Sequence, residues 1–167
     1  MSSDRELVDA ERVVAARIGE LGVDADSMAA ISNIFRVATT IRNHMERTVL
    51  AGPDLSFTAF TVLWVLWIWG EQEARHVAEE SGMSRGTLTG VVTTLERRGL
   101  VQRRTHPDDR RSVLVAATDA GEALMAELFP AFNAEEAKVS ADLSSRRQDQ
   151  LADALRTILR TVERLDG

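Results

Sequence analysis

Residues 95–115 read LERRGLVQRRTHPDDRRSVLV, and this stretch decides the fold class. It combines six arginines with two valine-containing runs and a polar turn around Pro107 and Asp108. Residues 101–104 and 112–117 are predicted to form two short strands, because β-branched residues favour strands and because proline and aspartate favour the turn between them. The stretch therefore predicts a basic β-hairpin in a chain whose hydrophobic spacing is otherwise helical.

A helix-turn-helix is predicted directly before this hairpin, in residues 76–92, HVAEESGMSRGTLTGVV. Ala78 is small where two helices approach, Gly82 can adopt a positive φ in the turn, and Leu88 and Val91 are placed to face the preceding helix. The second helix then offers polar and basic side chains that suit base edges and phosphates, namely Ser84, Arg85, Thr87, Thr89 and Thr93.

The charge of the chain is unevenly distributed. The net charge is −6, yet residues 84–111 hold seven arginines and three acidic residues, a net +4, so the remainder carries −10. A basic patch on an acidic protein indicates a polyanion bound at one place, although a solvated arginine-rich surface has the same composition. We expect Arg110 and Arg111 at the hairpin tip to enter a narrow minor groove, with Asp109 orienting Arg111 through an ion pair.

The rest of the sequence predicts helices. An extension helix ends at Gly22, a one-sided helix runs from about Asp26 to Gly52, and FTAFTVLWVLWIW, residues 57–69, forms a buried helix capped by Ser56. A short helix covers residues 71–81. Thr118 caps a helix that we expect to be bent or broken at Pro130.

The last helix is predicted to begin with a capping box of Ser145 and Gln148. Its apolar residues alternate spacings of four and three, which is typical of a helix-pairing seam. This seam predicts a homodimer, and its members are Leu151, Leu155, Ile158, Val162 and Leu165.

A set of aromatic and basic residues is a candidate pocket for a flat, anionic effector: Phe35, Arg36, Arg42, His44, Phe60, Trp64 and Trp67. Core packing of the aromatic rings and solvation or pairing of the basic groups are the competing interpretations.

Composition excludes several kinds of chemistry. The chain has no cysteine, so it forms neither disulfides nor thiolate metal sites. Three scattered histidines give no zinc motif, and neither a nucleophile elbow nor a glycine-rich phosphate loop is present. We expect no enzymatic activity, no cofactor and no metal. Apolar runs shorter than a membrane span and an acidic N-terminus without a secretory signal make the cytoplasm the expected location.

The sequence resembles the MarR family of winged-helix regulators through LERRGLV, DDRRSVLV and ATDAGEAL, over roughly residue 29 to the C-terminus. The resemblance implies a homodimer with intertwined terminal helices, in which each winged helix reads half of a pseudo-palindromic operator under ligand control. It also implies that Asp109 and Arg111 are paired wing residues and that Arg85, Thr87 and Thr89 lie on the recognition helix. Gly90 departs from the polar residue that many members carry, and the extension helix occurs in only some of them.

The expected fold is mainly α with a small β-hairpin wing, a winged helix-turn-helix plus a helical dimerisation region. Residues 1–55 are assigned to N-terminal dimerisation helices, residues 56–118 to the DNA-binding region and residues 119–167 to C-terminal dimerisation helices. The expected function is that of a DNA-binding repressor released by an effector. The alternative is a winged-helix protein-interaction module or scaffold that binds no DNA.

Overall fold

The computed structural model describes residues 2–109 and 111–167, and it describes their side chains except for residues 2–7 and Glu20. Contacts divide the chain into two compact units, Met1–His44 and Met45–Gly167, and the boundary falls within one helix. We describe each unit by itself. The functional division at residues 55 and 118 stays a prediction.

The first unit is a helical hairpin. Helix α1 (Ser2–Ile18) continues into a short 3-10 turn (Gly19–Leu21), and Gly22 ends it with a φ of +65°, as the sequence predicted. Helix α2 (Ala25–Arg47) begins slightly earlier than predicted, because the Asp24 carboxylate accepts hydrogen bonds from the Ser27 backbone N–H at 3.0 Å and from its hydroxyl at 2.6 Å.

Helix α2 ends at Arg47, about one turn before the predicted end at Gly52. The next residues form turns, in which the Leu50 N–H donates to the Met45 carbonyl at 3.0 Å and the Leu55 N–H donates to the Leu50 carbonyl. Leu50 is fully buried. Burial of the Leu50 side chain in the second unit therefore stabilises the turn more than a longer α2 would.

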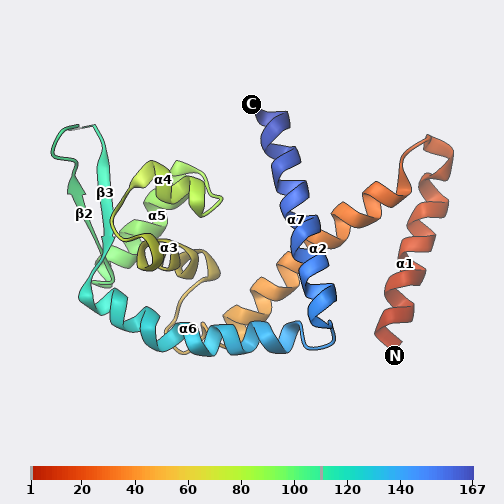
Figure 1. Cartoon of the computed structure of the whole chain (residues 1–167), viewed down its shortest axis with the longest axis horizontal. Coiled ribbons are helices and arrows are strands. Elements are labelled where there is room, and N and C mark those ends of the chain that lie inside the picture. The colour runs from red at the N-terminus through yellow and green to blue at the C-terminus, as the bar shows by residue number, and fades with distance from the viewer. Residues whose placement is uncertain (1, 110) are drawn as a thin grey trace. The chain divides into compact units, whose positions relative to one another are not determined.

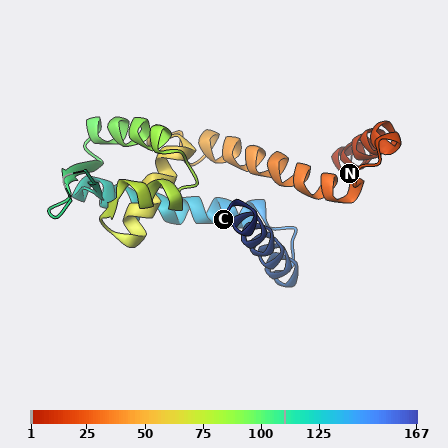
Figure 2. The same ribbon diagram turned by 90° about the horizontal axis from the view of Figure 1, so that it is seen from above.

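The second unit contains the winged helix-turn-helix (Figures 1 and 2). Its elements in chain order are α3 (Phe57–Trp69), β1 (Gln72–Glu73), α4 (Ala74–Glu80), α5 (Arg85–Arg97), β2 (Val101–Thr105) and β3 (Val113–Ala117). We call residues 101–117 the wing. The predicted helix over residues 71–81 is wrong at its start, where β1 pairs antiparallel with β3 and completes a sheet of order β1-β3-β2.

Side-chain caps set the starts of three helices in this unit, as the sequence predicted. The Ser56 hydroxyl accepts a hydrogen bond from the Ala59 N–H, the Ser84 hydroxyl from the Thr87 N–H, and the Thr118 hydroxyl from the Gly121 N–H. Each cap satisfies a backbone donor that the first helical turn leaves free.

The core of the second unit forms around α3, which is apolar on nearly every face. The Phe60 ring is 4% exposed and stacks on Phe132 with centroids 4.1 Å apart. Val62, Leu63 and Leu66 are also buried, as are residues of the other helices and of the sheet. Burial of each such side chain is worth about 1.5–3 kcal/mol, so α3 is the central stabilising element.

Two helices follow the wing; the first is not broken at Pro130, and the second lacks the predicted capping box. Helix α6 (Asp119–Val139) continues through Pro130, which is exposed, so water can satisfy the Ala126 carbonyl that lacks a helical donor. Helix α7 (Ser145–Asp166) has Ser144 as its N-cap residue without a side-chain cap. The Gln148 amide donates to the Ser140 carbonyl at 3.2 Å instead, so the capping box is wrong.

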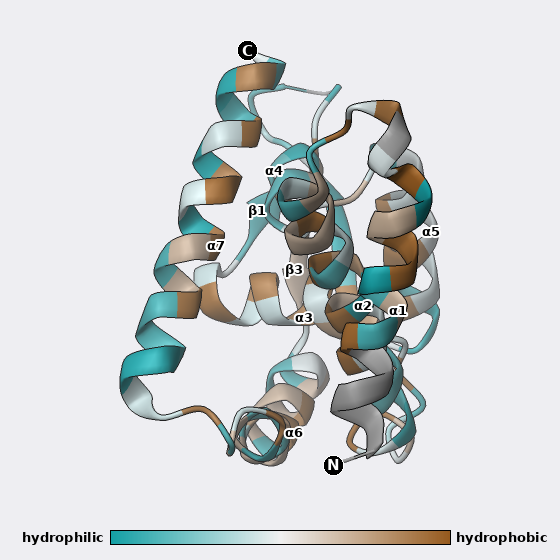
Figure 3. Ribbon diagram, turned by 90° about the vertical axis from the view of Figure 1, so that its right-hand side faces the viewer, coloured by the Kyte–Doolittle hydropathy of each residue, from teal (hydrophilic) through white to brown (hydrophobic). Residues whose placement is uncertain are grey.

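None of the residues of α7 is buried, and apolar bands recur along the helix (Figure 3). Among the described residues, none of the helices combines the length and the apolar character that crossing a bilayer requires.

Gly121 is predicted to allow the close backbone packing between the wing and α6. A Cβ at this position would lie 2.1 Å from the Leu100 carbonyl oxygen, which already accepts the Thr118 N–H. We expect Gly121→Ala to lower the free energy of unfolding by about 1–3 kcal/mol, because the backbone must move to relieve the clash. Thermal and denaturant unfolding measure this change.

Gly90→Ala is the matched control, since Gly90 is also helical but a Cβ there meets nothing within 4 Å. This variant should be as stable as the parent or up to about 1 kcal/mol more stable. Equal stabilities of the two variants would contradict the proposed close contact at Gly121.

Candidate nucleic-acid interface

Helix α5 presents the predicted recognition face to solvent. Arg85, Thr87, Thr89 and Thr93 are exposed, whereas Leu88, Val92 and Leu95 are buried against the rest of the winged helix. Val91, which the sequence placed against the preceding helix, is only partly buried, and Val92 is the buried valine. The turn before α5 has the predicted form, with Gly82 at a φ of +63°.

The threonine hydroxyls of α5 already donate hydrogen bonds within the helix. Thr89 donates to the Arg85 carbonyl at 2.8 Å and Thr93 donates to the Thr89 carbonyl at 2.8 Å. Ser84 and Thr87 share a hydrogen bond of 2.9 Å between their hydroxyls. In this state Thr89 and Thr93 offer a ligand an acceptor oxygen and a methyl group, which suits base amino groups and the thymine methyl group.

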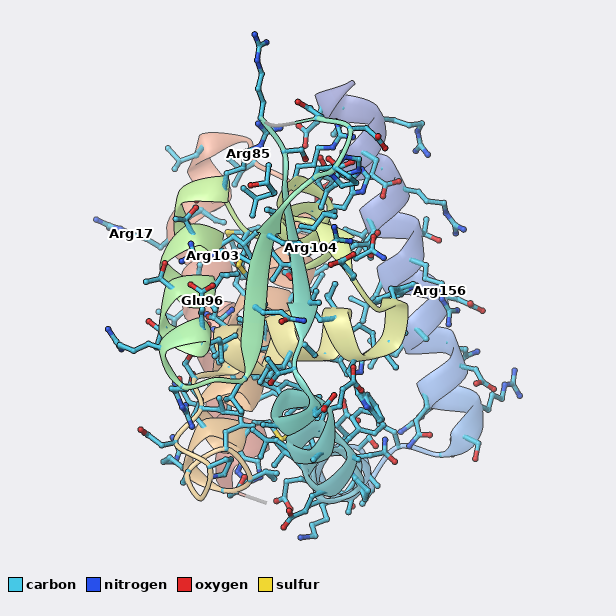
Figure 4. All side chains as sticks on the ribbon, turned by 90° about the vertical axis from the view of Figure 1, so that its left-hand side faces the viewer. Arg17, Arg85, Glu96, Arg103, Arg104 and Arg156 are labelled. Atoms are coloured by element: carbon cyan, nitrogen blue, oxygen red, sulfur yellow. The ribbon has the colours of Figure 1, made fainter. Side chains whose placement is uncertain are left out.

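Three of the arginines that the sequence assigned to a basic patch are held by protein groups. Arg103 of β2 pairs with Glu96 of α5 (Figure 4). Arg104 pairs with Glu71, which directly precedes β1. The Arg98 guanidinium donates to the Asp54 and Pro53 carbonyls at 2.6 Å each. These contacts fasten the wing and the end of α5 to the rest of the winged helix, and the part of these three residues in DNA binding stays a prediction.

Both carboxylates that hold the wing strand have lowered pKa values. The hydrogen bond from Arg103 lowers the pKa of Glu96, and the hydrogen bond from Arg104 lowers the pKa of Glu71, in each case against a smaller opposing effect of desolvation. A carboxylate with a lowered pKa in the folded state stabilises the fold above its ordinary pKa, and this contribution is lost as the pH falls through the lowered value. These ion pairs are thus intact at neutral pH.

Asp109 makes two hydrogen bonds to backbone groups on the far side of the wing turn. The Asp109 carboxylate accepts a hydrogen bond from the Arg111 backbone N–H at 2.9 Å, and the Ser112 N–H donates to the Asp109 carbonyl at 2.9 Å. The two side chains do not form the expected ion pair, so Asp109 fixes the turn rather than the guanidinium. The predicted contact residue Arg110 lies outside the described residues.

A cavity of about 370 Å³ lies where the wing meets the starts of α4 and α5. Arg85, Thr89, Asp109 and Arg111 line it, so the structure brings recognition-helix and wing residues together. Among the described residues, no ion pair or side-chain hydrogen bond occupies the guanidinium group of Arg85 or Arg111. Of the patch arginines with described side chains, Arg85 and Arg111 thus line this cavity, whereas the exposed Arg97 lies at the C-terminal end of α5.

Sequence reasoning missed two charged residues of the same cavity, Glu73 and Arg75. The Arg75 guanidinium forms an ion pair with Glu73 at 3.0 Å, and the Ser112 hydroxyl donates to Glu73 at 2.7 Å. The segment that contains them has no marked strand pattern, and the partner Ser112 is 39 residues away.

The predicted effector residues fall in both units. The part of α2 in the first unit carries four of them, Phe35, Arg36, Arg42 and His44. Phe35 is 70% exposed. On α3, Phe60 is part of the core, as the core-packing interpretation proposed. Trp64 and Trp67 are half-buried, and the Trp67 ring lies 5.4 Å from that of Phe129.

Comparisons with known proteins agree with this architecture. A model described as MarR family matches residues 55–113. An uncharacterized HTH-type transcriptional regulator, YwaE of Bacillus subtilis (strain 168), is 34% identical over 157 residues, which cover 92% of each chain.

Two solved structures show the same fold. Bordetella bronchiseptica BpsR, whose DNA binding is regulated by 6-hydroxynicotinic acid, has a TM-score of 0.70 at 24% identity and covers 77% of this chain and 98% of its own. Reduced AbfR bound to DNA has a TM-score of 0.68 at 20% identity and covers 84% of this chain and 94% of its own.

Proposed function

Since this chain belongs to the MarR family of DNA-binding transcriptional regulators, we propose that it acts as a homodimeric, sequence-specific repressor. The observation that carries the proposal is the face shared by α5 and the wing, where Arg85 and Arg111 line one cavity beside exposed threonines. In each protomer, α5 reads the major groove and the wing contacts the adjacent minor groove. Ser84, Thr87 and Thr93 complete the proposed α5 surface, and Arg110 completes that of the wing.

A homodimer is supported by apolar surface that the single chain leaves in water. Leu151, Val162 and Leu165 of α7 are 49%, 48% and 79% exposed, while Leu155 and Ile158 are half-buried. A second copy is the simplest partner for this seam, since most soluble oligomers are symmetric homo-oligomers. Two-fold symmetry places one recognition helix in each half of a pseudo-palindromic operator, with half-sites about one helical turn of DNA or a multiple of it apart.

Binding to operator and random duplexes across a salt series tests this function. We expect affinity for the random duplex to fall steeply with salt, because phosphate contacts release counterions. Genomic fragments that the protein retains should share a two-fold symmetric sequence, which it binds at least about a thousandfold more tightly than random duplex. A protein that shows no salt-dependent DNA binding would instead support the protein-interaction module.

The effector is proposed to be a small aromatic anion that lowers operator affinity. The half-buried Trp64 and Trp67 on α3 offer aromatic contact area, and BpsR offers a precedent in a protein of the same fold. A panel of aromatic carboxylates should include one compound that changes tryptophan fluorescence and weakens operator binding by about 5- to 150-fold.

Thermodynamic coupling between effector and operator DNA provides a control for this effect. Operator DNA must weaken effector binding by the same factor, because coupling between two binding sites is reciprocal. Trp64→Phe and Trp67→Phe should reduce this coupling, whereas Trp69→Phe, at the half-exposed C-terminal end of α3, should retain it. If the panel leaves both fluorescence and operator affinity unchanged, control by another protein becomes the better explanation of regulation.

A further inference from the structure

The cavity between the wing and the starts of α4 and α5 has the composition of an anion site. Arg75, Arg85 and Arg111 line it together with the carboxylates of Glu73 and Asp109, a net charge of +1. Three arginine residues, one each from α4, α5 and the wing, line one space of about 370 Å³. Guanidinium groups are well matched to phosphate oxygens, with which they form paired, charge-assisted hydrogen bonds.

Glu73 connects the parts of this cavity. It lies in β1, where its backbone is paired with Leu114 of β3, near the tip end of the wing strands. One carboxylate oxygen, Oε2, accepts the Ser112 hydroxyl at 2.7 Å and is 3.0 Å from Arg75 Nε, while Oε1 accepts Arg75 Nη2 at 3.2 Å. A single carboxylate thus holds both a wing residue and an arginine of α4.

We propose that this cavity binds a backbone phosphate of duplex DNA, with Arg75 as a phosphate-binding residue beside Arg85 and Arg111, and with Glu73 as the residue that positions Arg75 and the wing. The inference rests on the proposed DNA binding and adds to it a contact from α4. The wing and α5 alone supply two of the three guanidinium groups.

The retention of a carboxylate near a polyanion needs a physical reason. Electrostatics alone opposes it, because Glu73 repels phosphate. However, an arginine that is free in solution loses much rotamer freedom when DNA immobilises it, and an arginine already held by Glu73 loses less. The hydrogen bond from Ser112 chiefly lowers the pKa of Glu73, so the folded state favours the charged carboxylate that holds Arg75.

The competing interpretation is a surface ion pair without a role in binding. Exposed pairs of this kind contribute little to stability, so removal of Glu73 would then act only through its charge and would tighten DNA binding. The two interpretations predict opposite changes in DNA affinity when Glu73 is replaced by glutamine, so Glu73→Gln distinguishes them.

Glu80→Gln is the matched control. Glu80 is exposed at the C-terminal end of α4 and borders a separate cavity with Trp69, so this variant removes the same charge at the opposite end of α4 from Glu73. We expect Glu73→Gln to bind the operator about three- to tenfold more weakly than the parent. Glu80→Gln should bind equally well or slightly more tightly. Glu73→Gln binding as tightly as Glu80→Gln would overturn the positioning role.

Arg75→Gln tests the phosphate contact itself. It should weaken binding to operator and random duplex by about tenfold or more, and it should reduce the salt slope by about 0.9 for each phosphate that the protein no longer neutralises. When Arg75 is already replaced, the further substitution Glu73→Gln should lower DNA affinity only by loss of the contact between Glu73 and Ser112. The Ser112→Ala variant measures the effect of that contact alone. An Arg75→Gln variant with parental affinity at every salt concentration would overturn the site.

Operator duplexes with single neutral methylphosphonate linkages identify the ligand. The parent should lose affinity at one linkage in each half-site, and Arg75→Gln should be insensitive to that linkage. The site would be overturned if the parent and Arg75→Gln lost the same affinity at every substituted linkage. It would also be overturned if inorganic phosphate competed with DNA at constant ionic strength while no single linkage affected binding. If the parent does not bind DNA in a salt-dependent manner, the proposed function fails and not merely this inference.

Discussion

Replacing Leu155 and Ile158 of α7 by glutamate is expected to convert the proposed dimer into monomers and to lower operator affinity by roughly a hundredfold or more. No residue of α7 is buried, so its apolar stripe requires a partner, and two charges within the stripe would have to be desolvated on association. Loss of the dimer removes the linkage between half-sites, which leaves two weak, independent binding events. Analytical ultracentrifugation and operator titration measure the two effects.

Arg160→Glu on the same helix is the matched control. With 3.6 residues per turn, Arg160 lies opposite the seam of Leu151, Leu155, Ile158, Val162 and Leu165, and its replacement changes the charge by the same amount as the double substitution. It should remain dimeric and bind the operator nearly as well as the parent. A double variant that stays dimeric with parental operator affinity would show that the dimer forms through another surface.

Much of the fold was predictable because local signals agree with the final packing. Three helix starts are marked by the capping residues Ser56, Ser84 and Thr118. The turn of the helix-turn-helix is marked by Gly82, and the wing strands are marked by valine-containing runs. Strand β1 was missed because Gln72 and Glu73 have no strand propensity. This strand exists because β3 offers backbone partners, and such long-range pairing leaves no local pattern.

The functional site was only partly predictable for a related reason. The sequence reveals how many arginines lie near the wing but not which carboxylates neutralise them. Arg104 pairs with a residue 33 positions earlier, and Arg98 is held by backbone carbonyls that no composition analysis can assign. Three of the six arginines in residues 95–115 are held by protein groups, and two of the arginines that line the wing cavity, Arg75 and Arg85, lie outside that stretch.

Arg111→Ala is expected to weaken binding to the operator by about a hundredfold or more, because a dimer then lacks two charge-assisted hydrogen bonds worth about 1.5–3 kcal/mol each. Random-duplex affinity should fall as well, with a smaller salt slope, since the group removed is a positive charge at the DNA surface. Thr89→Ala provides the contrast. It should reduce the preference for operator over random duplex with little change in salt slope, because a threonine contacts bases without neutralising a phosphate.

Asp109 distinguishes the two mechanisms by which the wing can be organised. If an ion pair to the Arg111 guanidinium orients the wing, Asp109→Asn and Asp109→Ala should both weaken operator binding. The observed contact is instead from the Arg111 backbone N–H to the Asp109 carboxylate at 2.9 Å, and an asparagine side-chain oxygen can accept the same hydrogen bond.

We therefore expect Asp109→Asn to bind the operator as tightly as the parent or more tightly, because the turn is kept while a negative charge is removed. Asp109→Ala should bind the operator about five- to tenfold more weakly, since the turn loses its acceptor and the wing must be ordered on binding, while random-duplex binding changes little. Titrations of both variants against both duplexes decide the matter. Equal losses for asparagine and alanine would restore the ion pair as the organising contact, and tighter operator binding by Asp109→Ala would show that the wing needs no organising residue at all.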